Sequence, residues 1–99
     1  MNFWVSFRIS DDGGREAVYE ELVDACHKMA SRMVWEATTS FITFNCELET
    51  SQVVRNIKSV IRPNKDLAVV GSFTHKICRV IGDNPDPDIY KLLEFAKEG

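Results

Sequence analysis

Residues 3–14 read FWVSFRISDDGG, and they decide how the rest of the chain can be arranged. The apolar residues of this stretch alternate with Trp4, Ser6, Arg8 and Ser10, a period of two that predicts a strand with one buried face. The other face of this strand carries a large ring, an arginine and hydroxyls, so it differs from an ordinary solvated surface. Two aspartates and two glycines follow, which is turn chemistry that leads into a helix.

The composition indicates one globular domain. Of the 99 residues, 44% are hydrophobic and 27% are charged, values typical of a soluble folded protein. The three cysteines, Cys26, Cys46 and Cys78, are odd in number and widely spaced, so we expect buried free thiols rather than disulfides. No apolar run reaches the length of a membrane span, and the first residues lack the basic segment of a secretion signal. We therefore expect a cytoplasmic protein that does not bind a membrane.

Charge is distributed unevenly along the chain. The net charge of −3 gives no general attraction to nucleic acid. Residues 52–82 nevertheless carry six Lys or Arg and one Asp, whereas residues 1–51 and 83–99 are each net acidic. This asymmetry is more informative about partners than the total charge.

The remaining patterns predict helices and strands in alternation. We expect a helix over about residues 15–31, a hairpin of strands near 34–38 and 41–46, a helix over about 50–61 and a strand over 67–73. Residues 74–82 fit either a short helix or an edge strand, and these alternatives stay open. Asp86 and Pro87 then begin a final helix. The apolar face of this helix consists of Ile89, Leu92, Leu93 and Ala96.

This order predicts an α+β protein of the ferredoxin-like βαββαβ type. Two right-handed crossovers give a four-stranded antiparallel sheet with the helices on one face, and the first strand lies between the third and the fourth. The ferredoxin-like domain spans residues 1–82, and residues 83–99 form a C-terminal helical appendage.

The uncovered face of the predicted sheet is a candidate interface. It displays Trp4, Ser6, Arg8, Phe41, Thr43 and Asn45. An open face with two large rings commonly binds another protein, and a second copy of the chain is the commonest partner. The predicted homodimer interface consists of Trp4, Ser6, Phe41 and Thr43.

Three sets of charged residues are candidates for chemistry. Asp11 and Asp12 could hold Mg²⁺ through carboxylate oxygens and act as catalytic residues, or they could cap the following helix. Arg8, on the open face, could pair with a carboxylate such as Glu36 or contact nucleic acid. A basic stripe along the second helix could bind phosphates of RNA or DNA or could simply be solvated. This stripe consists of Arg55, Lys58, Arg62 and Lys65.

Two stretches resemble a known superfamily. The sequence VSFRISDD at residues 5–12, followed by an amphipathic helix, resembles the start of the CRISPR-associated adaptation proteins of the Cas-two family. Residues 35–72, WEATTSFITFNCELETSQVVRNIKSVIRPNKDLAVVGS, are similar to the SinR-like proteins that are grouped with that family and with VapD toxins. The resemblance is one of pattern, covers roughly residues 3–73 and leaves out the C-terminal helix.

The resemblance implies a ferredoxin-like homodimer that acts on nucleic acid, either as a metal-dependent nuclease or as a non-catalytic scaffold. Nuclease members carry an aspartate near the end of the first strand, and that position is Arg8 here. We therefore expect a dimeric protein that binds nucleic acid or a partner protein, in a toxin–antitoxin or phage-defence setting. Two alternatives remain open: a magnesium-dependent endoribonuclease that uses Asp11 and Asp12, and a dimerisation module without a nucleic-acid role.

Overall fold

Strand β1 (Asn2–Arg8) lies inside a six-stranded sheet in the computed structural model, which describes residues 1–99. The strand order is β2-β3-β1-β4-β5-β6. β1 pairs antiparallel with β3 (Phe41–Cys46) on one side and with β4 (Leu67–Ser72) on the other. Every second residue of β1, from Phe3 to Phe7, is buried, as its alternating pattern predicts. The sheet is therefore built outward from the stretch that opens the sequence.

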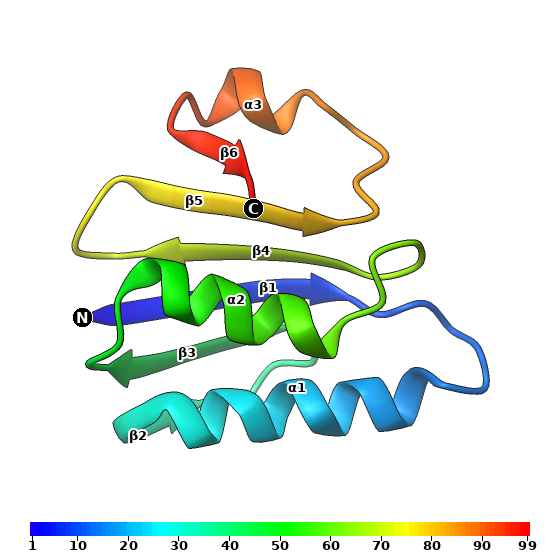
Figure 1. The fold of residues 1–99 in the computed structure, drawn as a ribbon, viewed down its shortest axis with the longest axis horizontal. Coiled ribbons are helices and arrows are strands. Elements are labelled where there is room, and N and C mark those ends of the chain that lie inside the picture. The colour runs from blue at the N-terminus through cyan, green and yellow to red at the C-terminus, as the bar shows by residue number, and fades with distance from the viewer.

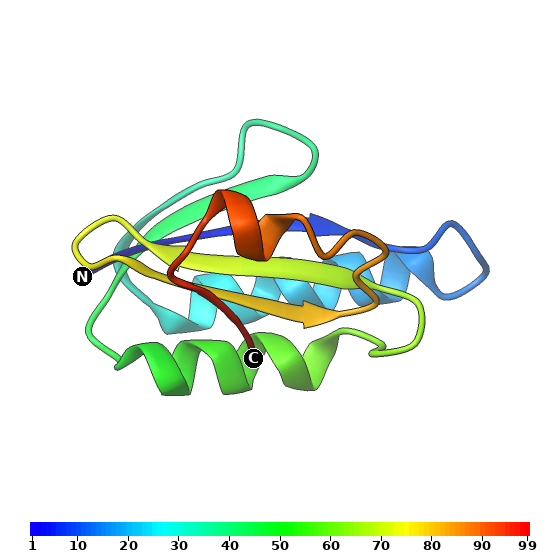
Figure 2. The same ribbon diagram turned by 90° about the horizontal axis from the view of Figure 1, so that it is seen from above.

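Two helices cover one face of the sheet (Figure 2). Helices α1 (Arg15–Met29) and α2 (Thr50–Val60) pack against each other, and α1 lies on β3 while α2 lies on β4 and β5. The core fills the space between these helices and the sheet, and burial of its apolar surface is the main source of stability. Its largest fully buried side chains include Phe3, Leu22, Ile42 and Ile57. The opposite face of β1 and β3 is free of these helices (Figure 2).

The first hairpin is irregular. Strand β2 (Ala30–Trp35) follows α1 directly, forms one edge of the sheet and pairs antiparallel with β3. Its register shifts between Ala30 and Val34, so the intervening residues do not pair regularly with β3. The Ser31 hydroxyl bonds the Asn45 side chain at this irregularity. β2 thus begins earlier than the strand predicted near residues 34–38.

The predicted four-stranded antiparallel sheet is wrong in strand number and in type. Residues 74–82, for which helix and strand stayed open, contain strand β5 (Ile77–Gly82), which pairs antiparallel with β4. Strand β6 (Ala96–Glu98) then pairs in parallel with β5, so the sheet is mixed. Because the free edge of β5 presents unpaired backbone N–H and C=O groups, a further strand satisfies them.

The predicted C-terminal helix is also wrong in length. Only α3 (Ile89–Leu92) is helical, and Ala96, expected on the apolar helix face, is buried in β6 beside Cys78. Leu92, expected on the same apolar face, is 80% exposed. Figure 1 shows α3 and β6 beyond β5, and residues 83–99 therefore extend the same sheet.

The cysteines lie in the interior. Cys26, Cys46 and Cys78 are free and buried, as the sequence predicts. Burial raises the pKa of the Cys26 thiol to about 12, so this thiol stays protonated at neutral pH. The cysteines therefore act as small apolar residues of the interior.

Candidate functional site

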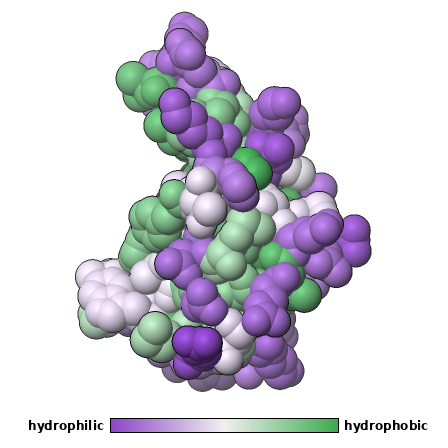
Figure 3. All heavy atoms as spheres, turned by 90° about the vertical axis from the view of Figure 1, so that its left-hand side faces the viewer, coloured by the Kyte–Doolittle hydropathy of each residue, from purple (hydrophilic) through white to green (hydrophobic).

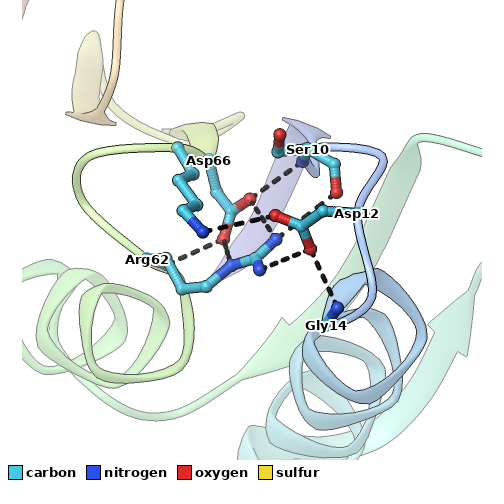
Figure 4. A network of polar contacts seen from close by, with 6 residues as sticks. Ser10, Asp12, Gly14, Arg62 and Asp66 are labelled. Carbon is cyan, nitrogen blue, oxygen red and sulfur yellow. Dashed lines mark hydrogen bonds and ion pairs between the residues drawn. The ribbon is translucent and has the colours of Figure 1, made fainter.

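Asp12, in the loop between β1 and α1, is bound by two basic side chains from the turn after α2 (Figure 4). Arg62 donates from Nη1 to Asp12 Oδ1 over 2.7 Å, and Lys65 Nζ lies 3.5 Å from Oδ2. The backbone N–H of Gly14 donates to the same Oδ1 over 2.9 Å. The hydrogen bonds from Arg62 and Gly14 lower the pKa of Asp12 to about 2. The Asp12 carboxylate is therefore anionic and already partnered.

A second carboxylate, Asp66, completes this cluster, and it is absent from the predicted site residues. Its side chain is 0% exposed. Arg62 donates from Nε and Nη2 to the two Asp66 oxygens over 2.9 and 3.0 Å. The backbone N–H groups of Arg62 and Ser10 donate to Asp66 over 2.8 and 2.9 Å. Burial raises the pKa of Asp66, but these hydrogen bonds outweigh it, and the pKa lies below its ordinary value.

We call Ser10, Asp12, Arg62 and Asp66 the Arg62 clasp. It joins the loop that follows β1 to the loop that precedes β4 (Figure 4). The Arg62 guanidinium lies against Asp12, one of the two carboxylates for which Mg²⁺ binding and helix capping were the alternatives. Asp11 is exposed, and no group of three or more His, Cys, Asp or Glu side chains is arranged to hold a metal ion. The clasp therefore gives Asp12 a structural partner and does not bring Asp11 to it.

The predicted basic stripe divides into two pairs. Arg62 and Lys65 are directed at Asp12. Arg55 is exposed, and Lys58 Nζ donates to the Gly99 oxygen over 3.2 Å. Because α2 contains no Asp or Glu, Arg55 and Lys58 keep its outer surface positive. Only this second pair is available to contact a phosphate.

Arg8 contacts the segment that follows β5. Its Nη2 donates to the Asp83 carbonyl oxygen over 3.2 Å and lies 3.9 Å from Asp83 Oδ2. Glu36, the carboxylate suggested as one possible partner, instead has its Oε2 atom 2.6 Å from His27 Nε2. The suggested pairing of Arg8 with Glu36 is wrong, because β3 separates β1 from β2 in the sheet.

Three aromatic side chains form a patch on the uncovered sheet face. Trp4 of β1 stacks on Phe41 of β3, with ring centroids 6.4 Å apart and 18° between the planes. Trp35 of β2 meets Phe41 edge-on at 6.3 Å and 66°. A Cβ atom at Gly71 would lie 2.2 Å from the Trp4 ring, so the glycine lets the indole pack directly on β4. We call Trp4, Trp35 and Phe41 the aromatic patch.

The predicted interface residues lie together at this patch. Trp4 is paired with Thr43, and Ser6 is paired with Phe41, on adjacent strands. Trp35, which is 49% exposed, pairs with Thr43 from the other side and was not among the predicted interface residues. Its face could not be assigned from the sequence, because the irregular register of β2 decides which residues of that strand face outward.

The surface beside the patch is hollowed into a groove of about 550 Å³. We call it the end groove, since it lies where β1 begins and β3 ends. Its lining includes Asn2, Arg32, Met33, Trp35, Asn45 and Phe73. Met33 and Phe73 are 70% and 64% exposed. Figure 3 views the molecule from this end and shows apolar and pale side chains exposed among hydrophilic ones.

No protein-family model and no curated protein matches the chain. None of the helices is both long and apolar enough to cross a bilayer. The resemblance to Cas-two-like and SinR-like proteins stays a prediction.

Proposed function

We propose that the protein is a small, non-catalytic homodimer of the Cas-two-like and SinR-like type that binds nucleic acid. The aromatic patch carries this proposal, because three large rings gather on the uncovered face of the sheet. Aromatic residues, Met and Arg are enriched in the cores of protein interfaces, whereas Lys, Asp and Glu are depleted there. The patch and its exposed neighbour Met33 match that composition.

The ferredoxin-like description forms part of this proposal. Strands β2, β3, β1 and β4 are neighbours in the sheet in this order, and each pair is antiparallel. Helices α1 and α2 make the two crossovers. A ferredoxin-like unit has this order of elements. In this description β5, α3 and β6 extend the unit at its β4 edge.

A second copy is the partner that the patch favours. The patch and the two hydroxyl residues between its strands, Ser6 and Thr43, carry no charge. Two copies can therefore meet about a twofold axis without placing like charges opposite each other. Because the rings stand on paired strands, little conformational freedom is lost when the patch is buried.

Nucleic-acid binding is supported by the outer surface of α2. Arg55 and Lys58 are exposed on a helix without acidic residues, where they can neutralise phosphates. A dimer contains this surface twice. The net charge of −3 means that such binding depends on the local surface rather than on the whole protein.

The non-catalytic part of the proposal rests on the Arg62 clasp. Metal-dependent cleavage would need the Asp12 carboxylate to bind a cation, and Arg62 and Lys65 already neutralise it. Replacing them by Mg²⁺ would also disturb the buried Arg62–Asp66 pair.

The dimer is tested by the Ser6→Glu variant, which adds a charge next to Phe41 of the patch. The expected result is a dimeric parent and a monomeric variant in size-exclusion chromatography with light scattering. Ser51→Glu, at the start of α2, makes the same change away from the patch and should remain dimeric. A monomeric parent, or a Ser6→Glu variant as dimeric as the parent, would rule out the patch as the interface.

The nucleic-acid role is tested by fluorescence anisotropy with labelled RNA and DNA at several salt concentrations. The Arg55→Glu/Lys58→Glu variant should bind more weakly than the parent, with a shallower dependence on salt. Arg15→Glu, on α1, is the control and should change binding less. A parent that binds neither RNA nor DNA at low salt would rule out the nucleic-acid role and favour the alternative of a dimerisation module.

A further inference from the structure

We infer that the end groove holds one base of an unpaired RNA or DNA strand, with the adjoining phosphate on Arg32. This inference rests on the proposed nucleic-acid function and assigns it a base-binding site. The groove lies apart from α2, so the two surfaces can be tested separately.

Each side of the groove carries an exposed aromatic side chain on which a base can stack. Trp35 stands on β2 and is 49% exposed, while Phe73 follows β4 and is 64% exposed. The Phe73 backbone N–H donates to the Asn2 carbonyl over 3.0 Å, which fixes that wall to the start of β1. Stacking of a base on an aromatic side chain tolerates any sequence, because every base has a π-face.

Two amide side chains lie between the walls. Asn45 Nδ2 donates to Asn2 Oδ1 over 2.8 Å, and the Asn45 amide oxygen accepts from the Ser31 hydroxyl. The Asn2 amide nitrogen forms no hydrogen bond within the protein and can donate to a ligand. Asparagine amides can bond the polar edges of bases.

The positive charge of the groove favours the binding of an anion. Arg32 is the only charged residue of the lining, so no carboxylate lines the groove. Lys76, in the turn after Phe73, adds a second exposed cation, and neither Arg32 nor Lys76 takes part in an ion pair. A nucleotide supplies both a base that can stack on the aromatic side chains and a phosphate that can pair with Arg32. The bases of a duplex are stacked on each other, so an unpaired strand is the form that fits.

The groove is compatible with the proposed dimer. Its floor lies at the Asn2–Asn45 pair, beyond the Trp4–Thr43 pair of the patch and toward the end of the sheet. A second copy centred on Trp4 and Phe41 leaves this end at the rim of the interface. Trp35 and Thr43 belong to both surfaces, and the variants that test the groove alter neither of them.

The experiment measures anisotropy of labelled oligouridylate and oligothymidylate, each alone and annealed to its complement. We expect the single strands to bind more tightly than the duplexes. Phe73→Ala should weaken single-strand binding about tenfold, the loss of one stacked base. Arg32→Gln should reduce the slope of log affinity against log salt by about 1. Leu92→Ala and Arg15→Gln are matched controls on other surfaces and should bind as the parent does.

The outcomes separate this inference from the proposed function. Binding that Arg55→Glu/Lys58→Glu weakens but Phe73→Ala and Arg32→Gln leave unchanged would overturn the groove and keep the nucleic-acid role. A preference for duplexes, or equal competition by a free mononucleotide, would overturn the choice of an unpaired strand. An absence of binding by the parent to any probe would overturn both proposals.

Discussion

Arg62 and Asp66 form a bidentate ion pair in which the carboxylate is fully buried, and the same guanidinium also holds Asp12. A residue that the sequence places in a phosphate-binding stripe thus joins the loops at one end of the sheet. Asp66 also accepts hydrogen bonds from two backbone N–H groups, so each of its carboxylate oxygens has two donors. This relationship determines how variants at this end of the molecule are expected to behave.

Removal of the buried carboxylate should destabilise the fold. Asp66→Ala leaves the backbone N–H groups of Ser10 and Arg62 without an acceptor and removes the anion that partners the guanidinium. We expect a loss of about 3 kcal/mol in the free energy of unfolding, measured by urea denaturation. The control Asp83→Ala alters an exposed carboxylate and should change stability by no more than about 0.5 kcal/mol. Equal effects of the two substitutions would argue against a structural role for the clasp.

The clasp also makes stability depend on acid pH. The pKa of Asp12 is lowered from 3.8 to about 2, and the pKa of Asp66 is lowered as well. Because both carboxyls bind protons more weakly in the folded state, their contribution is complete above about pH 4 and declines as the pH falls toward 2. Thermal unfolding across this range should show the decline, and Asp12→Asn should make it shallower. The control Asp11→Asn should show the same decline as the parent. An equally steep decline in Asp12→Asn would contradict the assignment of this acid dependence to Asp12.

The purified protein should not cleave RNA when Mg²⁺ is added. The basic side chains that neutralise Asp12 compete with any cation at this position. Labelled RNA incubated with the protein and Mg²⁺, then resolved on a denaturing gel, tests this expectation. Cleavage that Mg²⁺ stimulates and that Asp11→Ala/Asp12→Ala abolishes would support the endoribonuclease alternative instead.

The packing of the Trp4 ring on β4 depends on Gly71. A Cβ atom at Gly71 would overlap the indole, so Gly71→Ala forces the ring away from β4. We expect a loss of about 1–3 kcal/mol, typical of overpacking, together with a change in tryptophan fluorescence. Gly13→Ala is the matched control, because a Cβ there meets nothing within 4 Å. A Gly71→Ala protein with the stability and emission of the parent would mean that Trp4 does not rest on β4.

The parts of the fold set by local pattern could be predicted from the sequence. The alternation around Phe3, Val5 and Phe7 identifies β1 and its buried face, and the structure places these residues in the core. The same alternation puts Trp4 and Ser6 on the uncovered side. These predictions succeed because the period of a strand depends on neighbouring residues alone.

Features set by tertiary pairing could not be predicted in the same way. Residues 96–98 join the sheet because β5 offers them an unpaired edge, although Ala96 continues the helical spacing of Ile89, Leu92 and Leu93. Trp35 joins the patch because the register of β2 shifts, and Asp66 joins the clasp because the chain turns after α2. The end groove forms from four separate segments, so no single motif indicates it.

Dimer formation through the aromatic patch can be followed with the two tryptophans of the chain, Trp4 and Trp35, since both belong to the patch. Iodide quenching of their fluorescence should be measured on the parent and on Ser6→Glu, with the molar mass determined on the same samples. We expect twice the 11.3 kDa chain mass and weak quenching for the parent, and a monomer with strong quenching for the variant. A parent of 11.3 kDa whose tryptophans are quenched as readily as those of the variant would contradict this expectation.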